Sequence, residues 1–136
     1  MTETPTAFSD LRFRVATALA GTSVEPPGTT VYGDMVDAIT PPAYLLQWGD
    51  PWLTQKTYCH HDARLDVLCI AGRVEVAPAI STVEELIAVA ITRLSAMNLP
   101  DLLVLPPGRF DIGGITYIAA RLTLVAALSI PAPVYG

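Results

Sequence analysis

Both histidines and both cysteines of the chain lie within the stretch TYCHHDARLDVLCI, residues 57–70. Thiolates, imidazoles and carboxylates are ligands that zinc binds in proteins, and a cysteine beside a histidine is the arrangement of a thiol nucleophile with its general base. The residue types therefore suit either a metal site around Cys59, His60 and His61 or a cysteine-dependent catalyst. Which of these is possible depends on the element that carries the side chains.

The stretch alternates with a period of two and predicts one long β-strand. One face is mostly apolar and carries Cys59, His61, Ala63, Leu65, Val67 and Cys69. A zinc site needs four ligands that converge at about 2 Å each. In a strand, however, His60 points to the other face, and Cys69 lies about 33 Å from Cys59. That distance also excludes a disulfide.

Thiol catalysis meets a different obstacle. Cys59 and His61 are neighbours on one face, but no acid or amide on that face orients the imidazole. We therefore expect no catalytic residue, no metal site and no cofactor. A role for the Cys59–His60–His61 cluster is left open.

The composition predicts a single domain, residues 1–136, that does not act as a monomer. Hydrophobic residues make up 51% of the chain and charged residues 15%, against about a quarter charged in a typical domain; the mean hydropathy is +0.44. The best candidate for a membrane span, residues 115–130, is interrupted by Arg121 and is polar at several positions. Partner subunits are the remaining way to cover the surplus apolar surface.

Charge and targeting signals narrow the class of partner. The net charge is −5 and no segment gathers basic residues, so specific nucleic-acid binding is not expected. The N-terminus MTETPTAFSD has neither the basic region nor the apolar core of a secretion signal, and two cysteines without such a signal are typical of free thiols in a reducing compartment.

Two helices and about four strands are predicted to position these residues. Ser9 or Asp10 caps a first helix that stops at Gly21. A second helix opens at the overlapping capping boxes of residues 81–85 and carries an apolar stripe over residues 83–97. Strands are expected at residues 43–48 and 57–70 and twice within residues 101–130. The fold class is therefore α+β, an antiparallel sheet of about four strands with two α-helices packed on one face, and residues 1–8 and 131–136 are extended termini.

The closing strand and the loop GDPWLTQK supply the candidate interface residues. In residues 117–129 the core face alternates with a face that carries Tyr117, Arg121 and few other polar groups, which suits a subunit contact. Trp52 falls in the predicted loop, where an indole either folds back on its own core or docks on a neighbour. With Trp48 and Tyr58 nearby, we expect Trp52 at a contact with another subunit or with a partner protein.

Taken in order, these segments resemble the tail terminator proteins of long-tailed bacteriophages, particularly those of actinobacterial phages. After a short N-terminal helix come VYGDMVDAITPPAYLLQWGDPWLT, the strand HHDARLDVLCIAG, the helix TVEELIAVAITRL and the closing strand GITYIAARLTLVAAL. The most telling piece is VY, a spacer of eight residues, PPA, an aliphatic strand and a G-x-P-aromatic loop. The resemblance covers nearly the whole chain.

The resemblance implies a structural virion protein rather than an enzyme. Such a subunit forms a hexameric ring at the head-proximal end of the tail tube, ends tube polymerisation and joins the tube protein to the head-closure protein. It occupies the neck of the virion, after assembly in the host cytoplasm, and phage DNA passes its channel without specific binding. Two alternatives stay open: another neck component, such as a head-closure protein, and a small ligand-binding or metal-binding α+β domain.

Overall fold

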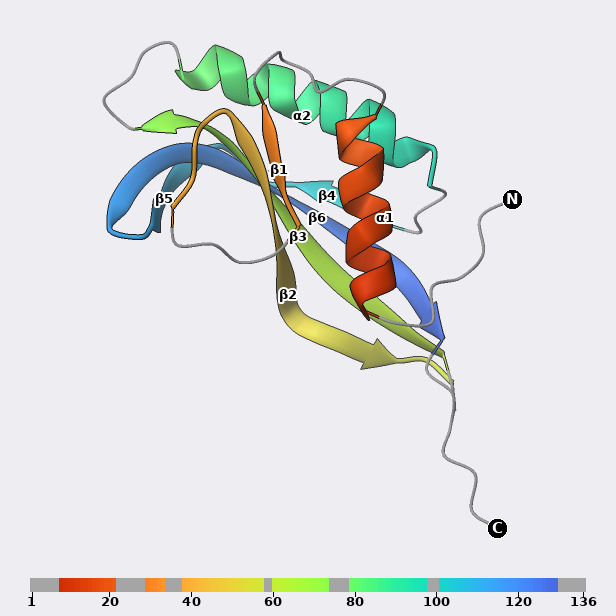
Figure 1. Cartoon of the computed structure of the whole chain (residues 1–136). Coiled ribbons are helices and arrows are strands. Elements are labelled where there is room, and N and C mark those ends of the chain that lie inside the picture. Colours follow the sequence, from red (N-terminus) through yellow and green to blue (C-terminus); the bar gives the residue numbers. More distant parts are fainter. Residues whose placement is uncertain are drawn as a thin grey trace.

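The computed structural model describes residues 8–21, 29–33, 38–57, 60–73, 79–97 and 101–129. Its elements, in chain order, are α1 (Phe8–Ala20), β1 (Thr30–Tyr32), β2 (Ala43–Gln55), β3 (His60–Arg73), α2 (Ala79–Ser95), β4 (Asp101–Val104), β5 (Gly108–Ile112) and β6 (Ile115–Ser129). The strands form one twisted sheet, and both helices lie on the same side of it (Figure 1). No helix in these ranges is long and apolar enough to cross a membrane.

The sheet confirms the α+β class and corrects its details. It has six strands in the order β1-β2-β3-β6-β4, with β5 also paired to β6. β1 runs parallel to β2, so the sheet is mixed, whereas we predicted about four antiparallel strands. β1 has only three residues, too few to show a period of two, and nothing in its sequence indicates the direction of its partner.

Two prolines explain the extra strand near the C-terminus. β4 and β5 follow one another along the same partner, β6, with Val104 opposite Leu122 and Gly108 opposite Ala119. Pro106 and Pro107 lie between them and lack the N–H groups that would continue the ladder. Hydrogen bonding resumes in a tight hairpin whose turn is Gly113-Gly114, with φ of 59° and 82°.

The main core lies between the helices and the sheet, as predicted. α1 contributes Leu11, Val15 and Leu19, and α2 contributes Leu86, Ala90 and Leu94. They pack on alternate residues of the three long strands: Tyr44, Leu46, Ala63, Leu65, Val67, Cys69, Leu122, Leu124, Ala126 and Leu128. A smaller cluster on the opposite face contains Ile39, Ala43, Leu45, Leu68, Ile70, Tyr117 and Ala119.

The helix boundaries differ slightly from prediction. α1 begins at Phe8, before the expected caps, and stops at Gly21, whose φ of 58° ends a helix. Residue 8 is therefore helical. Residues 1–7 and 131–136, the remainder of the two predicted extended termini, lie outside the described residues. α2 begins at Ala79, so the predicted capping boxes fall within its first two turns.

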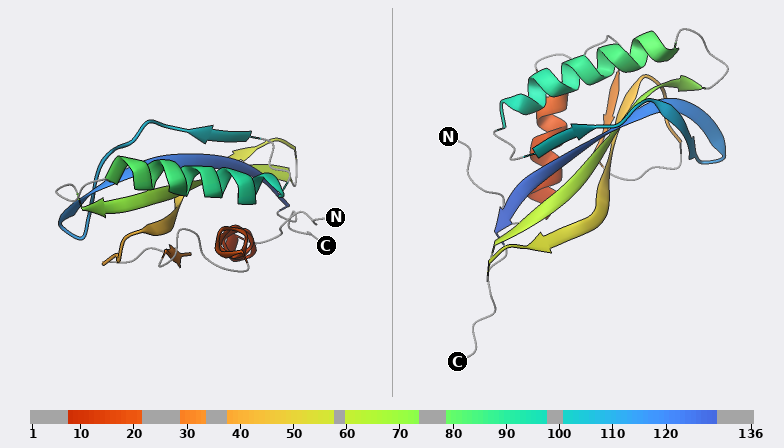
Figure 2. Two further views of the ribbon diagram at one scale, coloured as in Figure 1. Left: turned by 90° about the horizontal axis from the view of Figure 1, so that it is seen from above. Right: turned by 180° about the vertical axis from the view of Figure 1, so that it is seen from behind.

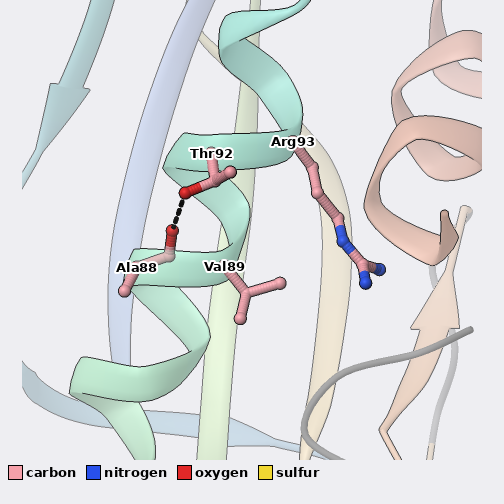
Figure 3. A pocket seen from close by; sticks show the side chains of 4 residues that line it. All are labelled: Ala88, Val89, Thr92 and Arg93. Atoms are coloured by element: carbon pink, nitrogen blue, oxygen red, sulfur yellow. Dashed lines mark hydrogen bonds between the residues drawn. The ribbon is translucent and has the colours of Figure 1, made fainter.

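Arg93 of α2 joins the two helices. Its guanidinium donates hydrogen bonds to the carbonyl oxygens of Leu19, at 2.6 Å, and Ala20, at 2.9 Å. These are the last carbonyls of α1, which have no partner within their own helix. Figure 3 shows the side chain of Arg93 reaching from α2 toward α1, with Thr92 pointing elsewhere and bonded to Ala88. A positive charge at this end also suits the helix dipole.

Replacing Arg93 by Met should lower the free energy of unfolding by about 2 kcal/mol, because two charge-assisted hydrogen bonds are lost while the aliphatic stem is kept. Urea unfolding of the variant measures this change. Thr92→Ala is the matched control, since the exposed Thr92 bonds only within its own helix and its loss should cost less than about 0.5 kcal/mol. Equal stability of the two variants would contradict the assigned link between the helices.

Candidate subunit interface

The stretch that holds the histidines and cysteines supplies most of β3, and its apolar face packs in the main core. Ala63, Leu65, Val67 and Cys69 are all fully buried, which confirms the predicted apolar face. His60 is exposed and His61 is half-buried, with no hydrogen-bond partner for its Nδ1 among the described residues. Cys59 lies outside those residues, and the described part of the chain holds no group of three or more His, Cys, Asp or Glu side chains suited to a metal ion.

Burial makes Cys69 chemically inert. Burial raises the pKa of its thiol to about 12, because the charged thiolate would lie in an apolar environment without water. At neutral pH the group is a thiol, which is neither a nucleophile nor a metal ligand. Cys69 therefore acts as a small hydrophobic residue against the helices.

Cys69 should react with a thiol reagent such as Ellman's reagent only after unfolding. The test uses Cys59→Ser, which leaves Cys69 as the sole thiol of the chain. Adding Cys69→Ser should cost about 1–3 kcal/mol in stability, because a hydroxyl replaces the thiol in the core, while leaving self-association unchanged. Rapid labelling of the native Cys59→Ser variant would contradict the buried position.

Trp52 lies in a strand and not in the predicted loop. β2 continues through GDPWLTQ, with a bulge between Trp48, opposite Leu65, and Leu53, opposite Ala63. Pro51 lacks the N–H of a regular ladder, so the chain bulges around it and then rejoins β3. The stem of Arg64 fills the space beside Gly49, where any Cβ would overlap it.

The bulge directs Trp52 onto a cluster of aromatic rings, which we call the aromatic edge: Phe8, Trp48 and Trp52. The Trp48 and Trp52 rings lie 5.3 Å apart between centroids, and Phe8 of α1 lies 5.4 Å and 4.8 Å from them. Trp52 nevertheless keeps 45% of its surface exposed. The indole thus packs partly on its own subunit and offers the rest outward.

The other predicted interface residues are not brought together at this edge. Tyr58 lies outside the described residues. Tyr117 is only 1% exposed, and its hydroxyl donates to the carbonyl of Ile39 at 3.4 Å, so it contributes to the smaller core of its own subunit. Arg121 lies on the sheet face opposite the helices, which we call the open face, and its guanidinium stands over the ring of Phe110 at 5.5 Å.

Arg121 belongs to a polar cluster that sequence reasoning missed. Its Nε lies 3.5 Å from Oδ2 of Asp66, and the Thr123 hydroxyl donates to Oδ1 of the same carboxylate at 2.8 Å. Asp66 is only 8% exposed. The cluster lines a hollow of about 320 Å³ on the open face, together with Gln47, Trp48, Asp50, Arg64, Leu103 and Leu105.

Sequence reasoning also missed an apolar groove at the β4 edge of the sheet. It lies between α2 and the β4–β5 connection, has a volume of about 330 Å³ and is lined by Val83, Glu84, Ile87, Val104, Leu105, Pro106, Pro107 and Ala120. Val104 and Leu105, which line it, are 37% and 42% exposed, and Leu103, which lines the open-face hollow, is 57% exposed. The sequence signal is the run LLVLPP, which is more apolar than a short, solvent-exposed edge strand normally is.

The aromatic edge and the apolar groove involve strands that are not neighbours in the sheet, β2 and β4. Seen from above, α1 and β1 lie along one side of the sheet and β4 along the other, with α2 between them (Figure 2, left). α1 also carries Phe13, which is 70% exposed because it lies two residues from Leu11 and off the buried stripe of its helix. Each side of the subunit thus presents apolar surface to solvent.

Comparison of the sequence with protein-family models and with curated proteins gives no match.

Proposed function

We propose that this chain is a tail terminator subunit of a long-tailed bacteriophage. In this role several copies form a ring, hexameric by the resemblance, at the head-proximal end of the tail tube. The ring ends polymerisation of the tube protein and presents its other face to the head-closure protein. The role is structural, in the neck of the virion, and involves no catalytic residue and no cofactor.

The observation that carries the proposal is the placement of exposed apolar side chains on two strands of one sheet that are not neighbours. A ring built by repeating one contact needs two different surfaces on each subunit, one for each neighbour. The half-exposed Trp52 is carried by β2, and the exposed Leu103, Val104 and Leu105 lie in or directly after β4, at the other end of the sheet order. Consecutive apolar residues on an edge strand favour association, so a partner that covers them is expected.

The negative net charge of the chain is consistent with the proposed channel, through which DNA passes without being bound. The chain carries a net charge of −5, so six copies would carry −30. Like charge between a ring and the phosphate backbone disfavours tight binding, which suits a passage for DNA.

The mass of the native assembly tests the proposal. Six copies of the 14.5 kDa chain give about 87 kDa by sedimentation or native mass spectrometry. Added to the polymerising tail tube protein of the same phage, the ring should shorten the tubes seen by electron microscopy and lie at their ends. A chain that stays a monomer and leaves tube length unchanged would refute the proposal.

A further inference from the structure

We propose that the hollow on the open face binds a carboxylate group carried on a short aliphatic chain, and that Arg64 and Arg121 hold this carboxylate. The inference goes beyond the proposed function, because it assigns a ligand site to a surface for which the ring contacts need no ligand. It holds whether or not the chain assembles into a ring.

The two arginines approach the hollow from opposite directions. Asp66 faces Thr123 in the register of β3 against β6. Arg64 lies two residues before Asp66 on β3, and Arg121 lies two residues before Thr123 on β6. Because the two strands are antiparallel, the arginines share the open face and lie on either side of the Asp66–Thr123 pair. Both line the hollow, so two cationic side chains border one space.

Arg121 is held in place while its donors stay available. Its Nε faces Oδ2 of Asp66 at 3.5 Å, and its guanidinium lies over the ring of Phe110 at 5.5 Å. The side chain is partly exposed and makes no hydrogen bond with any described residue. A guanidinium has five N–H donors in a fixed fork. The terminal N–H groups of Arg121 can therefore bind an acceptor in the hollow without first leaving another partner.

Arg64 supplies a second guanidinium, which the bulge of β2 positions. Arg64 is half-buried, yet it forms no ion pair or hydrogen bond with any described residue. The bulge between Trp48 and Leu53 leaves it without a facing residue on β2. Its stem occupies the space that a Cβ at Gly49 would need. Bulges often redirect a side chain at a functional site, and this one gives the stem of Arg64 its place beside the hollow.

The rest of the lining offers an apolar surface next to these polar groups. Gln47 and Asp50 come from β2, whereas the exposed Leu103 and Leu105 come from β4 and the residue after it. β3 and β6 lie between these two strands in the sheet. A short alkyl chain can therefore lie on the leucines while its carboxylate meets the arginines. The volume of about 320 Å³ lies within the range of roughly 300–1,000 Å³ typical of small-molecule sites.

The charges in the hollow favour a carboxylate over a phosphate. Arg64 and Arg121 bring two formal positive charges, and Asp50 and Asp66 bring two negative ones. Asp66 is already compensated, because it accepts a hydrogen bond from Thr123 and pairs with Arg121. Asp50 is exposed, so water screens it. One further negative charge suits two guanidiniums, and a planar carboxylate matches their fork. A phosphate dianion would add a second charge beside two carboxylates.

Titration of the full-length chain with sodium butyrate, followed by the NMR signals of the arginine Nε–H groups, tests the site. Saturable shifts are expected at Arg64 and Arg121. Arg109 is the internal control, since it is exposed on β5 and does not line the hollow. Arg64→Met and Arg121→Met should each weaken butyrate binding at least about tenfold, because each removes one charged partner of the carboxylate. Shifts that do not saturate, or equal binding by both variants and the wild type, would overturn the proposal.

Two further variants keep the test valid if Arg121→Met, which leaves Asp66 without its cation, fails to fold as judged by thermal melting. Arg64 has no described partner, so Arg64→Met should melt like the wild type. Gly49→Ala should displace the stem of Arg64 and weaken butyrate binding, whereas Gly108→Ala, where an added Cβ meets no atom closer than 4.0 Å, should bind like the wild type. Full binding by a folded Arg64→Met variant would overturn the role of Arg64.

Two more probes identify the source and the charge of the ligand. The α-amide of N-acetylglutamate carries its carboxylate on a peptide backbone, so tighter binding of this probe assigns the site to a glutamate of a partner protein. Tighter binding of butyrate assigns it to a small free acid. Inorganic phosphate should bind at least about tenfold more weakly than butyrate, and phosphate binding as tight as that of butyrate would overturn the assignment. These titrations report on the hollow itself, so their failure is distinct from failure of the chain to form a ring.

Discussion

Leu122→Asp should abolish folding of the subunit. Leu122 is fully buried in the middle of β6, with Val67 of β3 on one side and Val104 of β4 on the other. An aspartate there would place an unpaired charge within the main core, at a cost of several kcal/mol together with the lost apolar contacts. A domain of this size has a total stability of about 5–15 kcal/mol, so little of the native state would survive.

Leu86→Asp on α2 should have the same outcome, since Leu86 is also fully buried in that core. Soluble yield, circular dichroism and thermal melting measure the loss. Ala88→Asp is the control, because Ala88 lies two residues along the same helix but is exposed. If Leu86→Asp or Leu122→Asp melted like the wild type, the assigned facing of its element would be wrong.

Elements with a strong local period were predictable from the sequence. The apolar stripe of α2 and the alternation of β3 and β6 report which side chains face the core, because the period of an element is fixed by its own backbone. The number and direction of strands were not predictable. β1 and β4 are short, and their pairing depends on hydrogen bonds to strands distant in sequence.

The features of the candidate surfaces were also predictable only in part. Trp52 was predictable as an exposed aromatic, but its support by Phe8 depends on where α1 packs. The groove joins α2 to the β4–β5 connection, and no local pattern indicates that these segments meet. The bond between Thr123 and Asp66 spans 57 positions and follows only from the register of β3 against β6.

Asp66→Ala should lower the free energy of unfolding by about 2–3 kcal/mol. The whole side chain of Asp66 is only 11% exposed, and its carboxylate accepts a hydrogen bond from Thr123 while pairing with Arg121. Its removal leaves a hydroxyl and a guanidinium without their acceptor inside the sheet face, and such unpaired groups are costly. Because 38% of the Arg121 side chain reaches solvent, water compensates in part, and the loss stays below that of a fully buried pair.

Asp62→Ala provides a matched control for this loss. Asp62 lies on the same strand and the same face, but its partner Lys56 is 3.6 Å away and their side chains are 29% and 59% exposed. A surface pair of this kind contributes about 0–1 kcal/mol, so Asp62→Ala should unfold at nearly the wild-type urea concentration.

Asp66→Asn separates the two interactions of the carboxylate. The amide oxygen still accepts from Thr123, whereas the charge that attracts Arg121 is lost, so this variant should fall between the wild type and Asp66→Ala. Combining Asp66→Ala with Thr123→Val in a double-mutant cycle should give a coupling of about 1 kcal/mol, because Val leaves no unpaired hydroxyl. Strictly additive losses would show that the hydroxyl and the carboxylate do not stabilise one another, and that β3 and β6 are held at this row by backbone pairing alone.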